Sequence, residues 1–167
     1  MTQGRLYYNS GMIDLTIPGA GTAQISHLVL DVNGTIAIDG TLLEGMPRAI
    51  ASLQNRLDVH LITADTHDRQ DQIDHILGMK AVRLQPGDEA VQKAAFIRQL
   101  GGSSCAAIGQ GANDALMLAE AWLGIAVLSP EGLCADALAS ARIIMPDIFS
   151  AFSLLENPQR IVSTLRK

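Results

Sequence analysis

The segment LVLDVNGT (residues 28–35) places a carboxylate directly after an apolar run. An apolar run that ends in turn residues is typical of a buried strand. Asp31 is therefore expected at the carboxyl end of a strand, which is where open α/β sheets bind their ligands. A carboxylate held there can act as a nucleophile or hold a cation. Asn33 is unexpected at its position, because proton transfer would favour a second acid.

Phosphoryl transfer to a carboxylate is the chemistry that this segment suggests, and it needs several further groups. The phosphate oxygens need hydroxyl or amide donors, and their charge needs a cation and usually Mg²⁺. Thr63 ends the next apolar run and offers a hydroxyl, while the amides of residues 32–34, including Gly34, could form a concave array for an anion. Lys93, in a predicted helix, offers the cation, and Lys80, at a predicted strand start, is the alternative.

The turn GQGAND (residues 109–114) carries the remaining polar candidates. It follows an apolar run and precedes a predicted helix, so it brings a helix N-terminus to the edge of the sheet. Asn113 and Asp114 lie at the end of this turn. We therefore expect them at the same edge as Asp31 and Thr63.

The elements that must position these residues alternate between strand and helix. Apolar runs predict core strands at residues 27–32, 59–62, 81–84, 105–108, 125–127 and 143–144, and a short edge strand at 12–17. Helical patterns with start and stop signals predict helices at residues 47–56, 67–77, 88–100, 112–121, 148–155 and 158–165, with Cys134 in a further helix. The pair Asp39-Gly40 predicts a small hairpin over residues 35–43.

This alternation predicts the fold class. Strands separated by helices favour right-handed βαβ crossovers and a parallel sheet. The protein is expected to be a three-layer α/β/α sandwich with a mainly parallel, Rossmann-like sheet. Its 167 residues are expected to form a single domain, residues 1–167.

The composition limits the kinds of partner that the protein is expected to bind. The 48% of hydrophobic residues suffice for a core, and a net charge of −5 argues against a nucleic-acid surface. No apolar run is long enough to span a bilayer, and no signal-peptide pattern opens the chain, so we expect a cytoplasmic protein that is not bound to a membrane. Cys105 and Cys134 are interpreted as buried thiols of a reducing compartment.

Taken together, the motifs resemble those of the haloacid-dehalogenase-like (HAD) hydrolases. That superfamily carries, in this order, a strand followed by Asp-x-Asp-Gly-Thr, a strand that ends in Thr or Ser, a helical Lys, and Gly-Asp-Gly-x-Asn-Asp. The chain has DVNGT (residues 31–35), Thr63, Lys93 and GQGAND (residues 109–114) at the matching places. Its TAD (residues 63–65) is also similar to the Thr-Gly-Asp of P-type ATPases, so it looks like the soluble proteins related to their phosphorylation domain.

The chain departs from the superfamily pattern at two positions. Asn33 replaces the aspartate that protonates the leaving group and activates water in HAD phosphatases, and asparagine has no titratable proton near neutral pH. P-type pumps have Thr at this place and still hydrolyse their aspartyl-phosphate. Gln110 replaces an aspartate that usually binds Mg²⁺, which implies weaker metal affinity.

The resemblance implies a role for each candidate residue. Asp31 would form an aspartyl-phosphate, with Thr63, Lys93 and Asn113 on the phosphate oxygens and Gly34 in the adjoining amide array. Mg²⁺ would be bound by Asp31, the carbonyl of Asn33 and Asp114, with Gln110 as a further ligand. No insertion of cap size interrupts the chain, so the resemblance implies a capless domain with an open site under a hairpin flap.

Three functions remain open at this point. The first is a Mg²⁺-dependent phosphohydrolase for a phosphorylated small molecule or phosphoprotein, in a chain that could form a homo-oligomer. The second is a catalytically impaired binding or regulatory module for a phosphorylated ligand or a partner protein, which the residues Asn33 and Gln110 motivate. The third is a receiver-like signalling domain, which does not account for the turn at residues 109–114.

Overall fold

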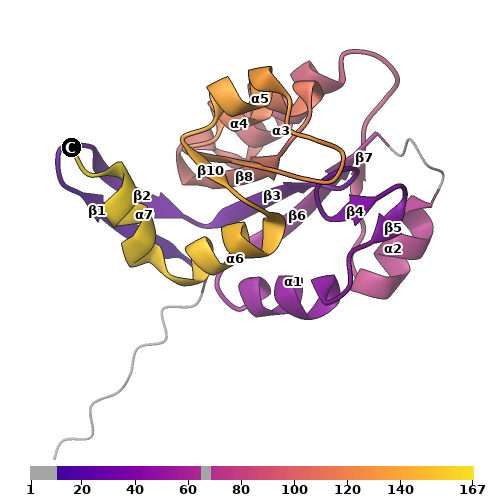
Figure 1. Cartoon of the computed structure of the whole chain (residues 1–167), viewed down its shortest axis with the longest axis horizontal. Helices are drawn as coiled ribbons and strands as arrows, with labels where there is room; N and C mark the ends of the chain where they lie inside the picture. Colours follow the sequence, from indigo (N-terminus) through magenta and orange to yellow (C-terminus); the bar gives the residue numbers. More distant parts are fainter. Residues whose placement is uncertain (1–10, 65–68) are drawn as a thin grey trace, which may run out of the picture.

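A six-stranded parallel sheet forms the centre of the protein in a computed structural model that describes residues 11–64 and 69–167 (Figure 1). The strand order is β10-β9-β8-β3-β6-β7, and every neighbouring pair is parallel. The predicted Rossmann-like sheet is therefore confirmed. Its strands are β3 (His27–Asp31), β6 (Asp58–Thr63), β7 (Val82–Arg83), β8 (Cys105–Gly109), β9 (Leu123–Val127) and β10 (Ile143–Met145).

Helices cover both faces of this sheet and make the predicted three layers (Figure 1). One face is packed by α1 (Met46–Gln54), α2 (Gln70–Leu77) and α6 (Ile148–Glu156). The other is packed by α3 (Glu89–Leu100), α4 (Ala115–Glu120) and α5 (Ala135–Ser140).

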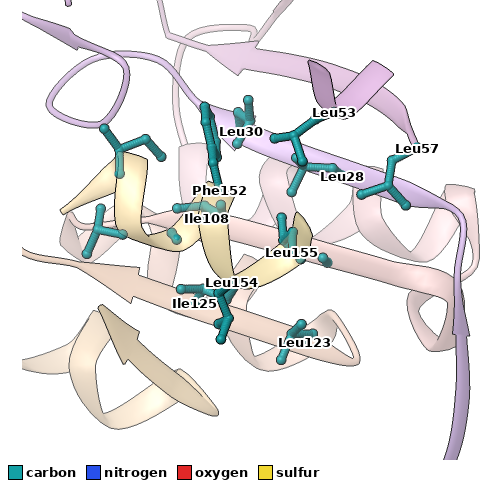
Figure 2. Packing of buried hydrophobic residues seen from close by; sticks show 14 of the residues in the cluster. Leu28, Leu30, Leu53, Leu57, Ile108, Leu123, Ile125, Phe152, Leu154 and Leu155 are labelled. Carbon is teal, nitrogen blue, oxygen red and sulfur yellow. The ribbon is translucent and has the colours of Figure 1, made fainter. Parts of the chain in front are cut away.

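Alternation of side chains along β3 divides the core in two. Leu28 and Leu30 point to the first face and Val29 to the second, as the period of two along a strand requires. Figure 2 shows the first face, where Phe152 and Leu155 of α6 lie over the sheet leucines. Each fully buried side chain of this kind contributes roughly 1.5–3 kcal/mol. The packed core on both faces holds the strand that carries Asp31 in place.

The N-terminal part of the described chain corrects one expectation. Residues 12–17 were expected to form an edge strand, but β1 (Ile13–Ile17) pairs with β2 (Gly21–Ile25) in a separate antiparallel hairpin. The apolar side chains of β1 are buried, and α7 (Pro158–Leu165) packs against it. This hairpin lies at the opposite end of the molecule from the β4–β5 flap (Figure 1).

The flap that was predicted between residues 35 and 43 is present. Strands β4 (Ala37–Ile38) and β5 (Thr41–Leu42) pair antiparallel around Asp39 and Gly40, which both have positive φ. Two consecutive positive φ angles match the twist of a tight hairpin. Among the described residues, no segment forms a cap domain over the carboxyl edge of the sheet.

Smaller differences concern element boundaries. The helix predicted at residues 112–121 begins as a 3-10 turn, η2 (Ala112–Asp114), and continues as α4, and Cys134 precedes α5 rather than lying within it. Asp65 of the TAD segment and the start of the helix predicted from residue 67 lie outside the described residues. Within residues 11–64 and 69–167, no helix is long and apolar enough to cross a membrane.

One testable consequence of the fold concerns His60, a half-buried ring on β6. Its Nε2 lies 3.2 Å from Nδ1 of His27, and its ring meets Phe96 edge-on at 5.6 Å between centroids. Burial, and then charge on His27, lower the pKa of His60 below its usual value, while Asp58 opposes the shift. At this ring the unfolded chain therefore binds more protons than the folded protein, and the contribution of His60 to the free energy of unfolding should fall as the pH drops through about 6.5.

Urea unfolding at about pH 7.5 and about pH 5.5 measures this loss of stability, since histidine titrates in that interval. His60→Gln should lose less stability than the parent on acidification. His75→Gln, at an exposed position of α2, is the matched control and should lose as much as the parent. An equal loss in all three proteins would contradict the assignment to His60.

Candidate active site

Asp31 is the last residue of β3 and lies at the carboxyl edge of the sheet, as predicted. Its side chain is buried, with 5% of its surface exposed. The Oδ1 atom accepts a hydrogen bond from Lys93 Nζ at 2.6 Å, and Oδ2 accepts one from Thr35 Oγ1 at 2.9 Å. Both carboxylate oxygens are therefore held in fixed directions.

Lys93 is the lysine of the site. It lies in α3, is 1% exposed, and its Nζ donates to Asp31 Oδ1 at 2.6 Å and to Asp114 Oδ1 at 2.7 Å. Lys80 is exposed, and of the two candidates Lys93 is the one that the structure places against Asp31. A single ammonium thus bridges two buried carboxylates, and this arrangement of three charges forms the centre of the site.

Asp114 is fully buried and is fixed by the turn from which it arises. Its Oδ2 accepts hydrogen bonds from the backbone N–H groups of Gln110 and Gly111, both at 2.9 Å. A Cβ at Gly109 would lie 2.5 Å from Asp114 Cγ, so only glycine permits this close approach. The glycine-rich turn is therefore needed to place the second carboxylate.

The buried charges act on one another. Burial, and then the negative charge of Asp114, raise the pKa of Asp31 to about 7, although Lys93 and Thr35 oppose the shift. Burial alone would lower the pKa of Lys93, but the two carboxylates outweigh it and raise that pKa above its usual value. Lys93 is therefore a permanent cation, and its charge favours the ionised form of Asp31 that a nucleophile requires.

Thr63 and Asn33 meet beside the charged centre. Thr63 is the buried last residue of β6, the strand next to β3, and its Oγ1 accepts a hydrogen bond from Asn33 Nδ2 at 3.2 Å. Gly34 differs from the expectation that it donates to an anion. Its N–H donates to the carbonyl of Ala37 at 2.7 Å and so belongs to the turn that leads into the flap.

Two acids that the motifs did not include, Glu89 and Glu131, lie near Asn113 and near Gly34. Asn113 Nδ2 donates to Oε2 of Glu89 at 2.8 Å. A Cβ built on Gly34 would lie 2.2 Å from Gln110 Nε2 and 2.5 Å from Oε2 of Glu131, so both side chains lie against that glycine. The predicted site residues thus gather at one edge of the sheet, but their polar surroundings are more acidic than expected.

Sequence reasoning missed three residues of this edge. Thr35 was part of the first motif but received no role, although it contacts the candidate nucleophile. Glu89 is four residues before Lys93, and this helical spacing could have placed both on one face. Glu131 has no local signal, because the turn after β9 brings it to Gly34.

Three curated proteins are similar to this chain, whereas no protein-family model matches it. An uncharacterized protein of Methanocaldococcus jannaschii, MJ0073, is 36% identical over 92 residues, which are 53% of this chain and 99% of that protein. The chain belongs to one family with it. Copper-transporting ATPase 2 of Rhizobium meliloti is 39% identical over 93 residues, which are 55% of this chain but 11% of the ATPase.

Solved structures decide the type of fold. The 3-deoxy-D-manno-octulosonate 8-phosphate phosphatase of Moraxella catarrhalis, solved with magnesium, phosphate and KDO, is 20% identical with a TM-score of 0.58, over 85% of this chain and 94% of that one. A protein of Legionella pneumophila described as a HAD superfamily (subfamily III A) hydrolase is 18% identical with a TM-score of 0.60, over 84% of this chain and 86% of that one. This chain has the HAD fold.

The donor atoms at this edge of the HAD fold suit a divalent cation. Asp31 and Asp114 supply carboxylate oxygens, which are the ligands that hard cations prefer. The described residues contain no group of three or more His, Cys, Asp or Glu side chains that could hold a metal ion by themselves. Mg²⁺ is usually bound by one or two carboxylates together with substrate phosphate and water, so these residues fit that ion.

The bridging lysine predicts a stability effect. Lys93→Met leaves two buried carboxylates without their cation, and breaking a buried ion pair in this way costs about 3–5 kcal/mol. The free energy of unfolding should fall by that amount when it is measured in urea with a metal chelator present. Lys80→Met is the matched control at an exposed site, and its effect should stay within about 0.5 kcal/mol. Equal effects of the two substitutions would contradict the bridging role.

Proposed function

We propose that the chain is a Mg²⁺-dependent phosphohydrolase that forms an aspartyl-phosphate on Asp31. The observation that carries this proposal is the buried bridge from Lys93 to both Asp31 and Asp114 at the carboxyl edge of a HAD fold. The substrate class that suits the site is a phosphorylated small molecule or a phosphoprotein. Since the site has no cap among the described residues, it admits substrates of either size.

In the first step a carboxylate oxygen of Asp31 forms a bond to phosphorus, and the bond from phosphorus to the leaving-group oxygen breaks. Lys93 favours the ionised form of the carboxylate and offsets negative charge that develops on the phosphoryl oxygens. Thr63 and Asn113 lie at the same edge and are the proposed donors to those oxygens. Mg²⁺, held by Asp31, the carbonyl of Asn33 and Asp114 with Gln110 as an uncharged donor, would neutralise further phosphate charge.

The leaving group must take a proton that position 33 cannot supply. Asn33 has an amide in place of a carboxyl group, and in the structure this amide donates to Thr63. The proton therefore comes from solvent, and leaving groups that are stable as anions should react fastest. In the second step water attacks the phosphorus of the aspartyl-phosphate, releases phosphate and returns Asp31, again without help from position 33.

Covalent labelling tests the proposed nucleophile directly. Incubation with radiolabelled acetyl phosphate and Mg²⁺ should label the parent protein, and hydroxylamine should remove the label because it cleaves acyl phosphates. Asp31→Asn should abolish both the label and the hydrolysis of an aryl phosphate. Asp136→Asn, an exposed acid of α5, should keep both. A label or turnover that survives Asp31→Asn would refute the mechanism.

Restoring the acid should accelerate turnover. Asn33→Asp is expected to raise kcat by about 100-fold, because a positioned acid–base group typically contributes 10²–10⁴-fold. The gain in kcat should be larger for an alkyl phosphate than for an aryl phosphate. An alkoxide is a poorer leaving group than an aryl oxide, so its departure depends more on protonation. Asn33→Ala, which removes the amide without adding an acid, should show no gain. An equal response of the two variants would contradict the role of position 33.

A second candidate function is a phosphate-binding or regulatory module with little turnover. It is favoured by Asn33 and Gln110, which replace two acids of the HAD motifs, and by Asn113, whose amide is engaged by Glu89. Trapping at Asp31 separates the two candidates, either with beryllium fluoride, which mimics a phosphoryl group on a carboxylate, or with radiolabelled acetyl phosphate. Labelling at Asp31 supports the enzyme, whereas a module would show no labelling and release no phosphate in a steady-state assay.

A further inference from the structure

The carboxyl edge of the sheet carries an excess of negative charge. Besides Asp31 and Asp114, the described residues place Glu89 against Asn113 and Glu131 against Gly34. In the described part of the chain, Lys93 is the cation that forms ion pairs with the two central carboxylates, and both of its contacts are used there. A substrate that enters this edge therefore meets at least one carboxylate without a partner cation.

Glu131 is presented by an ordered turn between β9 and α5. Its N–H donates to Ser129 Oγ at 3.0 Å, and the N–H of Gly132 donates to the Ser129 carbonyl at 2.8 Å. The end of the turn is tied to the site, because the N–H of Cys134 donates to the carbonyl of Gln110 at 2.8 Å. The position of the carboxylate thus follows from the backbone that also carries Gln110.

The side chain of Glu131 reaches the turn that follows the nucleophile. Gly34 has a φ of 81°, and a Cβ there would lie 2.5 Å from Glu131 Oε2. Gly34 is three residues after Asp31, so this carboxylate lies beside the turn that follows the nucleophile. Glu131 is exposed and, within residues 11–64 and 69–167, forms no ion pair, so its charge is available to a ligand.

A role for Glu131 in holding the metal ion is not supported by its position. It forms no metal-binding group with Asp31 and Asp114 among the described residues. At Gly34 it lies beside the side chain of Gln110, whose amide nitrogen is a donor. The exposed carboxylate is therefore accessible to the part of a substrate beyond its phosphate.

We propose that Glu131 determines specificity for the leaving group of the substrate. Its charge favours a phosphate monoester whose leaving group carries an ammonium group, and it disfavours one that carries a carboxylate or a second phosphate. This inference rests on the proposed phosphohydrolase activity. The physical cause is the Coulomb energy between the Glu131 carboxylate and a unit charge on the leaving group. At about 6 Å and an effective dielectric constant of about 40, this energy corresponds to a roughly tenfold change in the dissociation constant of the substrate.

Two phosphate monoesters test the proposal: O-phosphoethanolamine and 2-phosphoglycolate. Their leaving groups are of similar length but carry opposite charges, an ammonium and a carboxylate. The parent protein should show a kcat/KM about 100-fold higher for the ammonium substrate, chiefly through KM, because attraction of the ammonium and repulsion of the carboxylate each contribute roughly tenfold. Glu131→Gln should reduce this ratio by about 100-fold, and Glu131→Lys should invert it. The ratio of the parent should also shrink as ionic strength rises, because salt screens an exposed charge.

The matched control is Glu120→Gln, which removes an equal charge at the far end of α4, next to the amino ends of the strands. It should leave the substrate ratio unchanged. Stabilisation by beryllium fluoride, read as a thermal shift, should be equal in the parent, Glu131→Gln and Glu120→Gln, which shows that the phosphoryl site is intact. A ratio that Glu131→Gln leaves within twofold of the parent would overturn the specificity role.

Different experimental results would refute this inference and the proposed function. If no variant labels with acetyl phosphate or hydrolyses an aryl phosphate, the phosphohydrolase itself is refuted. If turnover is present and the charge at position 131 does not change the preference between the two substrates, only the specificity role is refuted.

Discussion

The contact between one buried ammonium and two buried carboxylates is the constraint on which the site depends. Lys93 comes from a helix on one face of the sheet, Asp31 from the central strand β3, and Asp114 from the turn after β8. Desolvation of three charges is costly, and it is offset only when each is paired and hydrogen-bonded. The glycine turn, Thr35 and the backbone N–H groups of residues 110 and 111 supply those bonds, so the site and the fold stabilise one another.

The fold explains why these groups meet. In a parallel sheet the carboxyl ends of neighbouring strands lie at the same edge, and β8, β3 and β6 are adjacent. Their last residues bring together the glycine turn, Asp31 and Thr63. The two hydrophobic cores hold the strands from both faces, so the polar side chains meet without a large loop. Chemistry at this edge therefore relies on rigid elements rather than on flexible segments.

Most of the central site could be predicted because its positions follow from periodic patterns. The local sequence shows where a strand ends, which helix carries the lysine and where the glycine turn lies. The parallel topology then brings these positions together at one edge of the sheet. Glu131 could not be predicted, because its place depends on the path of the turn after β9. The strand Gly21–Ile25 was missed for a different reason: only two of its residues are buried, so its apolar pattern is weak. Lys80 and Lys93 were separable only by burial, which follows from tertiary packing.

The two edges of the central sheet have a consequence for self-association. At one edge β10 has three residues, and at the other β7 has two. Such short edges offer few unpaired backbone groups, so another extended chain gains little by hydrogen bonding to them. The long strands that carry the site lie inside the sheet, where both neighbours are already present. A chain whose core is rich in isoleucine, leucine and alanine is thereby protected against growth of its central sheet into fibrous aggregates.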